Sequence, residues 1–389
     1  MRPESHDIVL LSTADWDNPF WTNKQHVAKE FEKLGYNVLY IESVGIRMPS
    51  AKNQDLRRIF KRMIRGLKPP RRVSTSIYVW SPLSIPLRRF KIINLFNHLF
   101  FNFLYTLYKW FILSKGKKKV LWTYLPITKQ YLQPNKFDIS VYHCVDDISA
   151  QPRMPVELIN SQEKLLSEEV DYIFTTAPAL QEKCNIWNEK TYFFPNVADH
   201  NHFSKALSDS CTIPDDIKKI DGPIVGFIGA ISSYKLDFDL ICSVAKHLPQ
   251  FSFVFIGKIG EGDPMTTVNE LYKIDNIHFL GPKDYTELPN YLKGIDIALL
   301  PNNINQYTTS MFPMKFFEYL AAGKPVVSVD LPAIKDHQDY YYCSTNSKDF
   351  AQNIELAYSQ KDKTNSINTN YSKRFDYTSR MKKMLDKIN

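Results

Sequence analysis

The chain has 389 residues, which is too long for one ordinary domain and sufficient for two. Hydrophobic residues make up 44% and charged residues 23% of it, which excludes a disordered or fibrous protein. The five cysteines are scattered without CxxC spacing, so neither a disulfide framework nor a zinc site is expected. We expect these cysteines to be reduced thiols in a cytosolic protein.

The net charge of +8 is unevenly distributed along the chain. Residues 47–119 contain 18 Lys and Arg and one acidic residue, Asp55, so this segment carries 18 − 1 = +17 and the rest carries 8 − 17 = −9. A basic block in an otherwise acidic protein favours an anionic partner, either a nucleic acid or a lipid surface.

The first half of the chain opens with the pattern of a βαβ unit. A strand is expected at 7–12, a helix at 23–34 that Gly35 ends, and a second strand at 37–42. The apolar run of the first strand is too short for a signal peptide, and no uninterrupted stretch of about 20 apolar residues follows anywhere. We therefore expect a cytoplasmic protein that does not span a membrane. Further strands of this half are expected at 120–123, 139–144, 172–176 and 191–194.

The second half repeats the pattern, with a strand at 223–231, a helix at 239–247 and a strand at 251–257. Short apolar strands that alternate with helices predict parallel sheets covered by helices on both faces. Further strands of this half are expected at 277–280, 295–300, 325–329 and 341–343.

The fold class predicted from this organisation is α/β, with two Rossmann-like domains in tandem. The first domain covers 1–205 and contains a basic, amphipathic insertion at 47–119; a linker at 206–222 joins it to the second domain at 223–370. Residues 371–389 form a C-terminal amphipathic helix, whose apolar side is formed by Phe375, Met381, Met384 and Ile388.

The segment 310–330 (SMFPMKFFEYLAAGKPVVSVD) predicts a turn, a helix and a strand. Pro313 suits the first turn of the helix, where its missing N–H is not needed, and the free amides of that turn suit a phosphate. Lys315 and Glu318 lie three residues apart on one face, a cation for a diphosphate and a carboxylate for ribose hydroxyls. The alternative is an ordinary ion pair on the helix surface.

The run P-x-K-x-x-E-Y-L-A-A-G-K-P-V-V at 313–327 resembles the nucleotide-binding signature of GT-B glycosyltransferases, in particular the family-4-like group that builds bacterial surface polysaccharides. The segments PIVGFIGAI (223–231), GIDIALLP (294–301) and PNVADHNHF (195–203) match the family more loosely. YHCVDD (142–147) is similar to a segment of the teichuronic-acid-type transferases.

The resemblance implies the GT-B architecture, in which two Rossmann-like domains face each other across a cleft and the C-terminal helix returns to the N-terminal domain. It implies donor binding in the second domain, with Glu318 on the ribose, Lys315 on the diphosphate and Gly229 allowing a close approach of the phosphates. The loop from Gly281 to Tyr285 would hold the base.

Two positions depart from the family pattern. Retaining members carry a glutamate eight residues before the second one, and this chain has Ser310 there. The usual Arg/Lys pair after the first strand of the second domain is not clear, and Lys235 is the candidate for its role. Whether the anomeric configuration is retained or inverted is therefore left open.

Acceptor binding is expected in the first domain, at the loop 15–24 (DWDNPFWTNK) after the first strand. Asp17, Trp21 and His26 are the acceptor-binding candidates, and Trp16 and Phe20 offer further rings for stacking on sugars. The alternative for these aromatic side chains is packing between domains.

Asp146 and Asp147 follow the strand at 139–144, and one of them is expected to act as the general base that takes the proton of an acceptor hydroxyl. The alternative is capping of the next helix.

No metal or other cofactor is expected. The tripeptides from Asp15 to Asp17 and from Asp237 to Asp239 resemble the metal-binding DxD of GT-A transferases, which is a weak signal. The pair His200 and His202 lacks a third ligand, and an exposed linker is the simpler interpretation.

Residues 57–72 are cationic with interleaved apolar residues, and 90–113 predict an amphipathic helix. Its expected apolar face is formed by Ile93, Phe96, Phe100, Phe103, Leu107 and Trp110, and its polar face by Lys91, Asn94, His98, Asn102 and Lys109. Such a helix fits the interface of an anionic membrane, whereas no nucleic-acid module surrounds the segment. The alternative is packing of the apolar face on the first-domain sheet.

These observations predict a glycosyltransferase that moves a sugar from a nucleotide-diphosphate sugar, with UDP as the expected nucleotide, to a lipid-linked or growing glycan acceptor. It would work peripherally on the inner face of the cell membrane, with an anionic surface as partner and no nucleic acid. The alternatives are a GT-B-fold sugar-nucleotide epimerase and a catalytically degenerate assembly partner.

Overall fold

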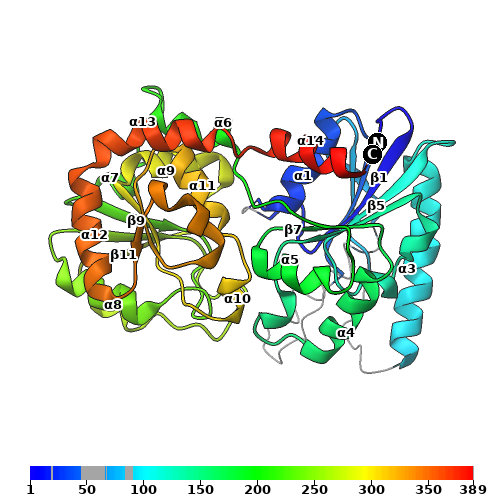
Figure 1. Ribbon diagram of the computed structural model, residues 1–389, viewed down its shortest axis with the longest axis horizontal. Coiled ribbons are helices and arrows are strands. Elements are labelled where there is room, and N and C mark those ends of the chain that lie inside the picture. The colour runs from blue at the N-terminus through cyan, green and yellow to red at the C-terminus, as the bar shows by residue number, and fades with distance from the viewer. Residues whose placement is uncertain (19–20, 45–65, 67, 84–90, 389) are drawn as a thin grey trace. The chain divides into compact units, whose positions relative to one another are not determined.

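The computed structural model describes residues 1–18, 21–44, 66, 68–83 and 91–388. The chain divides into two compact units, each a parallel sheet with helices packed against it (Figure 1). Unit 1 consists of Met1–Phe194 and Met381–Asn389, and unit 2 of Pro195–Arg380. The first unit therefore ends at Phe194, before residue 205, and the segment 206–222 belongs to unit 2.

Unit 1 is built around a sheet in which the described residues form eight strands, in the order β3-β4-β2-β1-β5-β6-β7-β8. All neighbouring strands pair in parallel except β3 with β4. The chain order reverses between β1 and β5, and open α/β sheets bind ligands beside the carboxyl ends of such strands. The strands are β1 (His6–Leu11), β2 (Val38–Ile41), β3 (Arg71–Arg72), β4 (Ile77–Trp80), β5 (Lys118–Thr123), β6 (Ile139–Cys144), β7 (Tyr172–Thr175) and β8 (Thr191–Phe193).

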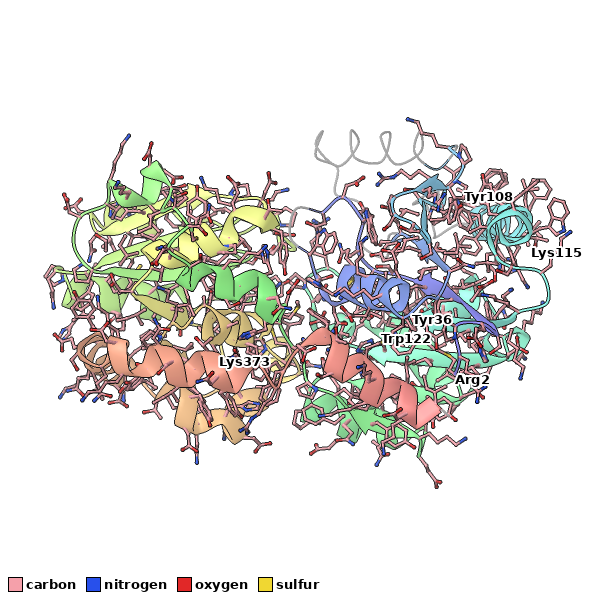
Figure 2. All side chains as sticks on the ribbon, turned by 90° about the horizontal axis from the view of Figure 1, so that it is seen from above. Arg2, Tyr36, Tyr108, Lys115, Trp122 and Lys373 are labelled. Atoms are coloured by element: carbon pink, nitrogen blue, oxygen red, sulfur yellow. The ribbon has the colours of Figure 1, made fainter. Side chains whose placement is uncertain are left out.

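The two faces of this sheet are buried by different helices, because successive side chains of a strand point to opposite faces. Ile8 and Leu10 lie in one core, with Phe31 of α1 (Asn23–Lys33) and Met384 of α14 (Tyr377–Ile388). In that core the ring of Phe31 meets Tyr36 and Trp122 edge-on, at centroid distances of 5.5 and 5.2 Å. Tyr36 and Trp122 are labelled in Figure 2. Val9, Leu11 and the neighbouring strand residues face α3 instead. The helices of this unit are α1 (Asn23–Lys33), α3 (Lys91–Ile112), α4 (Val156–Ser167), α5 (Pro178–Asn185) and the short η1 (Thr128–Gln130), η2 (Pro134–Lys136) and η3 (Ile148–Ala150).

Unit 2 has a sheet of six described strands in the order β11-β10-β9-β12-β13-β14, all paired in parallel. Its chain order reverses between β9 and β12. The strands are β9 (Ile224–Ile228), β10 (Ser252–Ile256), β11 (Ile277–Gly281), β12 (Ile297–Leu300), β13 (Val326–Val329) and β14 (Tyr342–Ser344).

The helices of unit 2 form two groups. The helices α8 and α12 contact each other, and α11 contacts α6 and α13. The bounds are α6 (His200–Phe203), η4 (Ser204–Leu207), α7 (Asp215–Lys218), α8 (Phe238–His247), η5 (Leu271–Lys273), η6 (Tyr285–Glu287), α9 (Leu288–Gly294), α10 (Gln306–Thr309), α11 (Met314–Ala321), η7 (Pro332–Tyr340), α12 (Ser347–Ser359) and α13 (Lys361–Ser372). The expected α/β class with two Rossmann-like sheets is thus confirmed, and the expected segment 206–222 is not a bare linker, since η4 and α7 lie in it.

The C-terminal helix differs in part from the prediction. The chain bends after α13, and α14 (Tyr377–Ile388) begins at Tyr377 rather than at residue 371. Met381, Met384 and Ile388 are buried in the core of unit 1, which confirms the return of this helix to the N-terminal domain. Phe375 does not share that face: its ring stacks on Phe317 in unit 2, at a centroid distance of 4.2 Å.

Candidate functional site

The start of α11 brings together the two residues that the signature predicts for the donor. Pro313 occupies the N-cap position just before the helix, and the amide of Phe316 donates to its carbonyl over 3.0 Å. The ammonium of Lys315 donates to Glu318 Oε2 over 2.7 Å. The Glu318 side chain is only 4% exposed and that of Lys315 is 21% exposed, so this is not the exposed surface pair that was the alternative.

Two aromatic side chains from other segments lie within the electrostatic influence of the Glu318 carboxylate. Burial raises the pKa of the Tyr285 hydroxyl, and the nearby charge of Glu318 raises it further. The ring of His202 stacks on Tyr285 at a centroid distance of 4.3 Å, and its Nε2 donates to the Tyr285 carbonyl over 2.8 Å. Burial lowers the pKa of His202, against the opposing charge of Glu318, so a neutral imidazole is favoured. Tyr285 and His202 therefore form a half-buried stacked pair that lies within the electrostatic influence of the buried Glu318 carboxylate.

Tyr319 ties α11 to the end of β9. Its hydroxyl accepts a hydrogen bond from the amide of Ile228 over 2.8 Å, and the side chain is fully buried. The residue after Ile228 is Gly229, so this bond fixes the helix beside the predicted phosphate loop. Asn196 holds the residues just before the same helix, because its side-chain amide donates to the carbonyl of Phe312 over 2.9 Å.

Gly229 lies where the backbones of two strands meet. The Gly229 amide donates to the carbonyl of Ile256 over 2.9 Å. Gly257 directly follows Ile256 in the sequence. A Cβ atom on Gly257 would lie 1.7 Å from the Gly229 carbonyl oxygen, so only glycine fits at this position. Gly281 ends β11 with a φ of +70°, and its carbonyl accepts from the Gly257 amide over 3.0 Å. Gly229, Gly257 and Gly281 thus lie side by side at the carboxyl ends of β9, β10 and β11, and they form a glycine edge of the sheet.

Lys235 lies at the reversal of strand order in unit 2. Its ammonium lies over the rings of Tyr234 and Tyr307, 5.4 and 5.5 Å from their centroids. The loop after β12 is joined to it, because the amide of Asn303 donates to the Lys235 carbonyl over 2.9 Å. Ser310 is half-buried just after α10, and its amide donates to the carbonyl of Tyr307 over 3.2 Å. Tyr307 therefore links Lys235 to Ser310.

In unit 1 the loop after β6 meets the start of α1. The ammonium of Lys24 lies 3.9 Å from Asp146 Oδ2 and 5.6 Å from the ring centroid of Tyr124. The Lys24 side chain is 9% exposed, whereas that of Asp146 is 28% exposed. These residues follow β1, β5 and β6, so they gather at the carboxyl ends of the strands where the chain order reverses.

Asp147 has a different environment from Asp146. Its Oδ1 accepts from the amide and the hydroxyl of Ser149, over 3.2 and 2.6 Å, and it lies 3.5 Å from Lys183 Nζ. Burial lowers the pKa of Lys183, but the carboxylates of Glu163 and Asp147 raise it more, so this lysine stays charged. Asp147 thus caps η3 and belongs to a buried ion-pair network, which agrees with the capping alternative for this residue.

The acceptor candidates after β1 do not form one cluster. Asp17 accepts a hydrogen bond from Arg71 over 2.6 Å, with both side chains about half exposed. The ring of Trp21 lies edge-on to His26 and tilted to Trp16, at 5.4 and 5.7 Å. His26 is buried within α1, so packing inside unit 1 describes Trp21 and His26 better than an open sugar platform. Phe20 lies outside the described residues.

Comparison with known proteins identifies the architecture. Residues 222–360 match the family model described as "Glycosyl transferases group 1". Sucrose-phosphate synthase from Thermosynechococcus elongatus has a TM-score of 0.67, at 15% identity over 98% of each chain. Trehalose-6-phosphate synthase OtsA has a TM-score of 0.66 at 12% identity over 98% of each chain, and Anabaena Alr3699/HepE one of 0.61 at 15% identity over 98% of this chain and 99% of that one. The chain has the GT-B fold.

A curated relative agrees with the GT-B resemblance. The "Putative teichuronic acid biosynthesis glycosyltransferase TuaH" of Bacillus subtilis (strain 168) is 30% identical over 243 residues. This match covers 59% of the present chain and 59% of the relative, so it spans about three fifths of the relative's length. The predicted resemblance to GT-B glycosyltransferases is confirmed.

Sequence reasoning missed several residues that contact the predicted ones within each unit. His202 was assigned to an exposed linker, but α6 holds it half-buried against Tyr285. Lys24, Tyr307 and Tyr319 were not singled out, since nothing near them in the sequence marks their tertiary contacts. The signature itself contains Tyr319, directly after Glu318, and its position was the one available signal.

The metal-like tripeptides have structural roles as far as the structure describes them. Asp237 caps α8 by accepting from the amide of Leu240 over 2.8 Å, and Asp17 pairs with Arg71. No cluster of three or more His, Cys, Asp and Glu residues within the described ranges has the arrangement of a metal site. A cavity of about 700 Å³ lies beside Asp237 and Asn302, on the side of α8 and α12, and neither Lys315 nor Glu318 lines it.

Proposed function

We propose that this chain is a glycosyltransferase that moves a sugar from a nucleotide-diphosphate sugar, with UDP as the nucleotide, to a lipid-linked or growing glycan acceptor of bacterial surface polysaccharide synthesis. One observation carries this proposal. A buried carboxylate, Glu318, is held by Lys315 at the first turn of a helix, within the segment that matches the group 1 family.

The donor would take over the contacts that these two residues now make with each other. The Lys315 ammonium would turn to the diphosphate together with the free amides of the first turn of α11. Glu318 would then accept hydrogen bonds from the ribose hydroxyls, and Tyr285 would border the base. The proposal of UDP is supported by the solved neighbours, since HepE is described in complex with UDP and glucose and an E. coli neighbour as bound with UDP-2-fluoro glucose.

The transfer needs a base for the acceptor, and we assign this role to Asp146 of unit 1. The acceptor hydroxyl would lose its proton to the carboxylate while its oxygen forms the bond to the anomeric carbon. The bond from that carbon to the phosphate oxygen breaks, and UDP leaves with the electron pair. Ser310 offers no carboxylate in unit 2, which is why a base from unit 1 is proposed. No metal ion is included in this scheme.

The acceptor is proposed to be presented at the inner face of the cell membrane. The segment 47–119 carries a charge of +17, which suits an anionic lipid surface. Of this segment, residues 47–65, 67 and 84–90 lie outside the described residues. Within the described residues, no helix is both long and apolar enough to cross a bilayer. The contact would therefore be peripheral.

The test is release of UDP from a panel of UDP-sugars, with and without membrane extract as a source of acceptor, in the presence and absence of EDTA. Transfer of a labelled sugar with UDP release in EDTA is the expected result. Epimerisation of the donor without UDP release would support the epimerase instead, and donor binding without any turnover would support a degenerate partner. Either outcome would contradict the proposal.

A further inference from the structure

Helix α3 presents a continuous face of large apolar side chains to solvent. Ile92, Leu99, Phe103 and Trp110 follow one another at steps of seven, four and seven residues, so they lie along one side of the helix. Figure 2 views this helix nearly end-on beside Tyr108 and Lys115, with side chains that point away from the rest of unit 1. The residues of the face are Ile92, Leu95, Phe96, Leu99, Phe103, Leu107, Trp110 and Phe111, each between 41% and 82% exposed.

The opposite side of α3 holds the helix on the sheet. Asn97, Phe101 and Tyr105 are buried there, and the ring of Phe101 packs on Trp80 at a centroid distance of 4.9 Å. Tyr108 meets the same Trp80 ring edge-on at 5.3 Å. The residues of the outer face therefore take no part in the cores that the described residues of unit 1 form. An exposed apolar patch of this extent marks an interaction surface.

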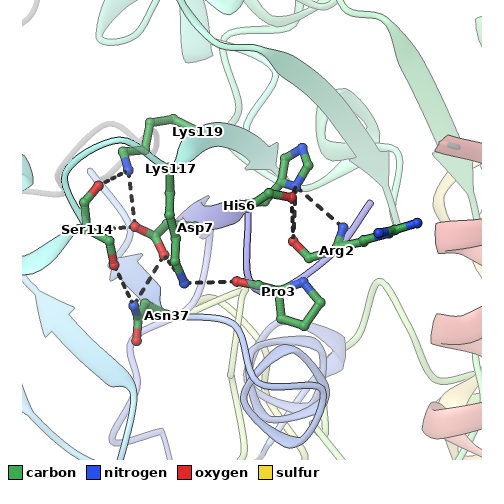
Figure 3. Close-up of polar contacts among 9 residues, drawn as sticks. Arg2, Pro3, His6, Asp7, Asn37, Ser114, Lys117 and Lys119 are labelled. Carbon is green, nitrogen blue, oxygen red and sulfur yellow. Dashed lines mark hydrogen bonds and ion pairs between the residues drawn. The ribbon is translucent and has the colours of Figure 1, made fainter.

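The C-terminal end of α3 is fixed by a buried carboxylate (Figure 3). Asp7 of β1 accepts from the amide of Ser114 over 2.6 Å and from the ammonium of Lys119 over 3.1 Å, and Lys117 lies 3.7 Å away. Two of the four lysines after the helix, Lys117 and Lys119, thus share one carboxylate, that of Asp7. The other two, Lys115 and Lys118, are exposed.

Positive charge borders the apolar face, and the stretch of sequence that contains this face holds no acidic residue. The ammonium of Lys115 lies 4.8 Å from the ring centroid of Trp110, which joins a cation to the aromatic end of the face. No Asp or Glu occurs in the sequence between Asp55 and Asp138. A second copy of the chain on this face would bring like charges together, whereas an anionic lipid surface complements them.

We propose that α3 lies in the interface of an anionic phospholipid membrane, with the Ile92–Leu99–Phe103–Trp110 side among the acyl chains and Lys115 and Lys118 at the phosphates. This names the membrane contact of the proposed function and rests on it for its purpose, which is to bring unit 1 to a lipid-linked acceptor. An aromatic and aliphatic face bordered by lysine is the pattern of helices that lie in the plane of a membrane surface. The helix would be held parallel to the surface, because its inner side stays on the sheet.

The experiment is flotation of the full chain with vesicles of phosphatidylcholine and phosphatidylglycerol, compared with vesicles of phosphatidylcholine alone. The wild-type chain should float with the anionic vesicles. Leu99→Glu with Phe103→Glu should lower the partition coefficient by about tenfold or more, because two carboxylates would enter the apolar layer. Lys115→Ala and Lys118→Ala should each weaken binding by about fivefold, and salt should reduce that difference.

The matched control is a second exposed isoleucine of unit 1. Ile92 is 82% exposed on α3 and Ile186 is 80% exposed after α5, so Ile92→Glu and Ile186→Glu make the same chemical change at the same exposure. Only Ile92→Glu should weaken flotation, and both variants should keep the wild-type unfolding temperature. Equal flotation of Ile92→Glu and wild type would overturn the proposal. So would a dimer in sedimentation velocity that Ile92→Glu dissociates, with no vesicle binding by either.

The result is separable from the proposed activity. Vesicle binding requires no turnover, so Glu318→Gln should float as the wild type does. UDP release by the α3 variants, measured without vesicles, should equal that of the wild type. Absence of vesicle binding by the wild-type chain, with intact turnover, would therefore identify a failure of the membrane assignment alone.

Discussion

Lys315 and Glu318 bond to each other over 2.7 Å at the first turn of α11, although the Glu318 side chain is almost completely buried. A buried carboxylate needs a partner, because desolvation disfavours its charge. The Lys315 ammonium is less buried than the Glu318 carboxylate. It can turn toward a phosphate when a ligand takes its place as the hydrogen-bond donor to Glu318. The pair is thus arranged to hold the carboxylate ready for another donor of hydrogen bonds.

We expect Glu318→Gln to lower kcat/KM for the UDP-sugar by about a hundredfold, because a charged acceptor for the ribose hydroxyls is replaced by a neutral one. The fold should persist, since Gln keeps an acceptor for Lys315. The control is Glu270→Gln, which alters an exposed Lys–Glu pair of the same spacing with Lys273. An unchanged kcat/KM in Glu318→Gln would contradict the donor assignment.

Substitutions of the two neighbouring aspartates, Asp146 and Asp147, should have different effects on turnover and on stability. Asp146→Asn should reduce turnover by about 10²- to 10⁴-fold, the range for removal of a general base, with little change in unfolding temperature. Asp147→Asn should instead destabilise the chain by about 1 kcal/mol, because it weakens the cap of η3 and the contact with Lys183. Steady-state kinetics and urea unfolding of both variants provide the test. Equal losses of activity would contradict the division of roles.

Much of this architecture is local in the sequence and was predictable for that reason. The expected strands at 139–144 and 172–176 appear as β6 and β7 almost residue for residue, since each is a short apolar run between turns. The donor signature was found because Pro313, Lys315 and Glu318 lie within six consecutive residues. By contrast, β4 was missed, because its four residues lie in a stretch without a repeating pattern.

The contacts that the sequence did not reveal are tertiary. Lys24 meets Asp146 only because β1 and β6 both flank β5 in the sheet, an order that no local pattern encodes. The face of α3 illustrates a second limit. The predicted apolar stripe contains Phe96, Phe103 and Trp110, and the structure leaves these rings exposed while Phe101 and Tyr105 pack inward. Aromatic residues surround most of this helix, so periodicity alone did not show which side the sheet would cover.

The unfolding free energy of the chain should fall as the pH falls from about 7 to about 5. Burial lowers the pKa of His202, His200 and His337, so the unfolded chain takes up protons below about pH 6.5 before the folded chain does. Stability from these groups is therefore complete above that pH and is lost below it. His202→Gln should reduce the slope of the unfolding free energy against pH, because one of these histidines is removed. Gln still offers a hydrogen-bond donor for the Tyr285 carbonyl. Urea titrations at a series of pH values measure this, and an identical slope in the variant would refute the buried neutral imidazole.

The glycine edge beside the donor loop predicts a contrast between two substitutions. A Cβ at Gly257 would lie 1.7 Å from the Gly229 carbonyl oxygen. Because a backbone atom cannot move aside as the end of a side chain can, Gly257→Ala should lower the free energy of unfolding by about 3 kcal/mol or more. At Gly281 no atom lies within 4 Å of the added carbon, and the φ of +70° alone should cost about 1 kcal/mol. Gly257→Ala should also lower donor affinity, because β9 and its loop must shift away from Tyr319. Chemical denaturation and donor titration of both variants test this order, and a more severe effect of Gly281→Ala would show that strain rather than close packing governs this edge.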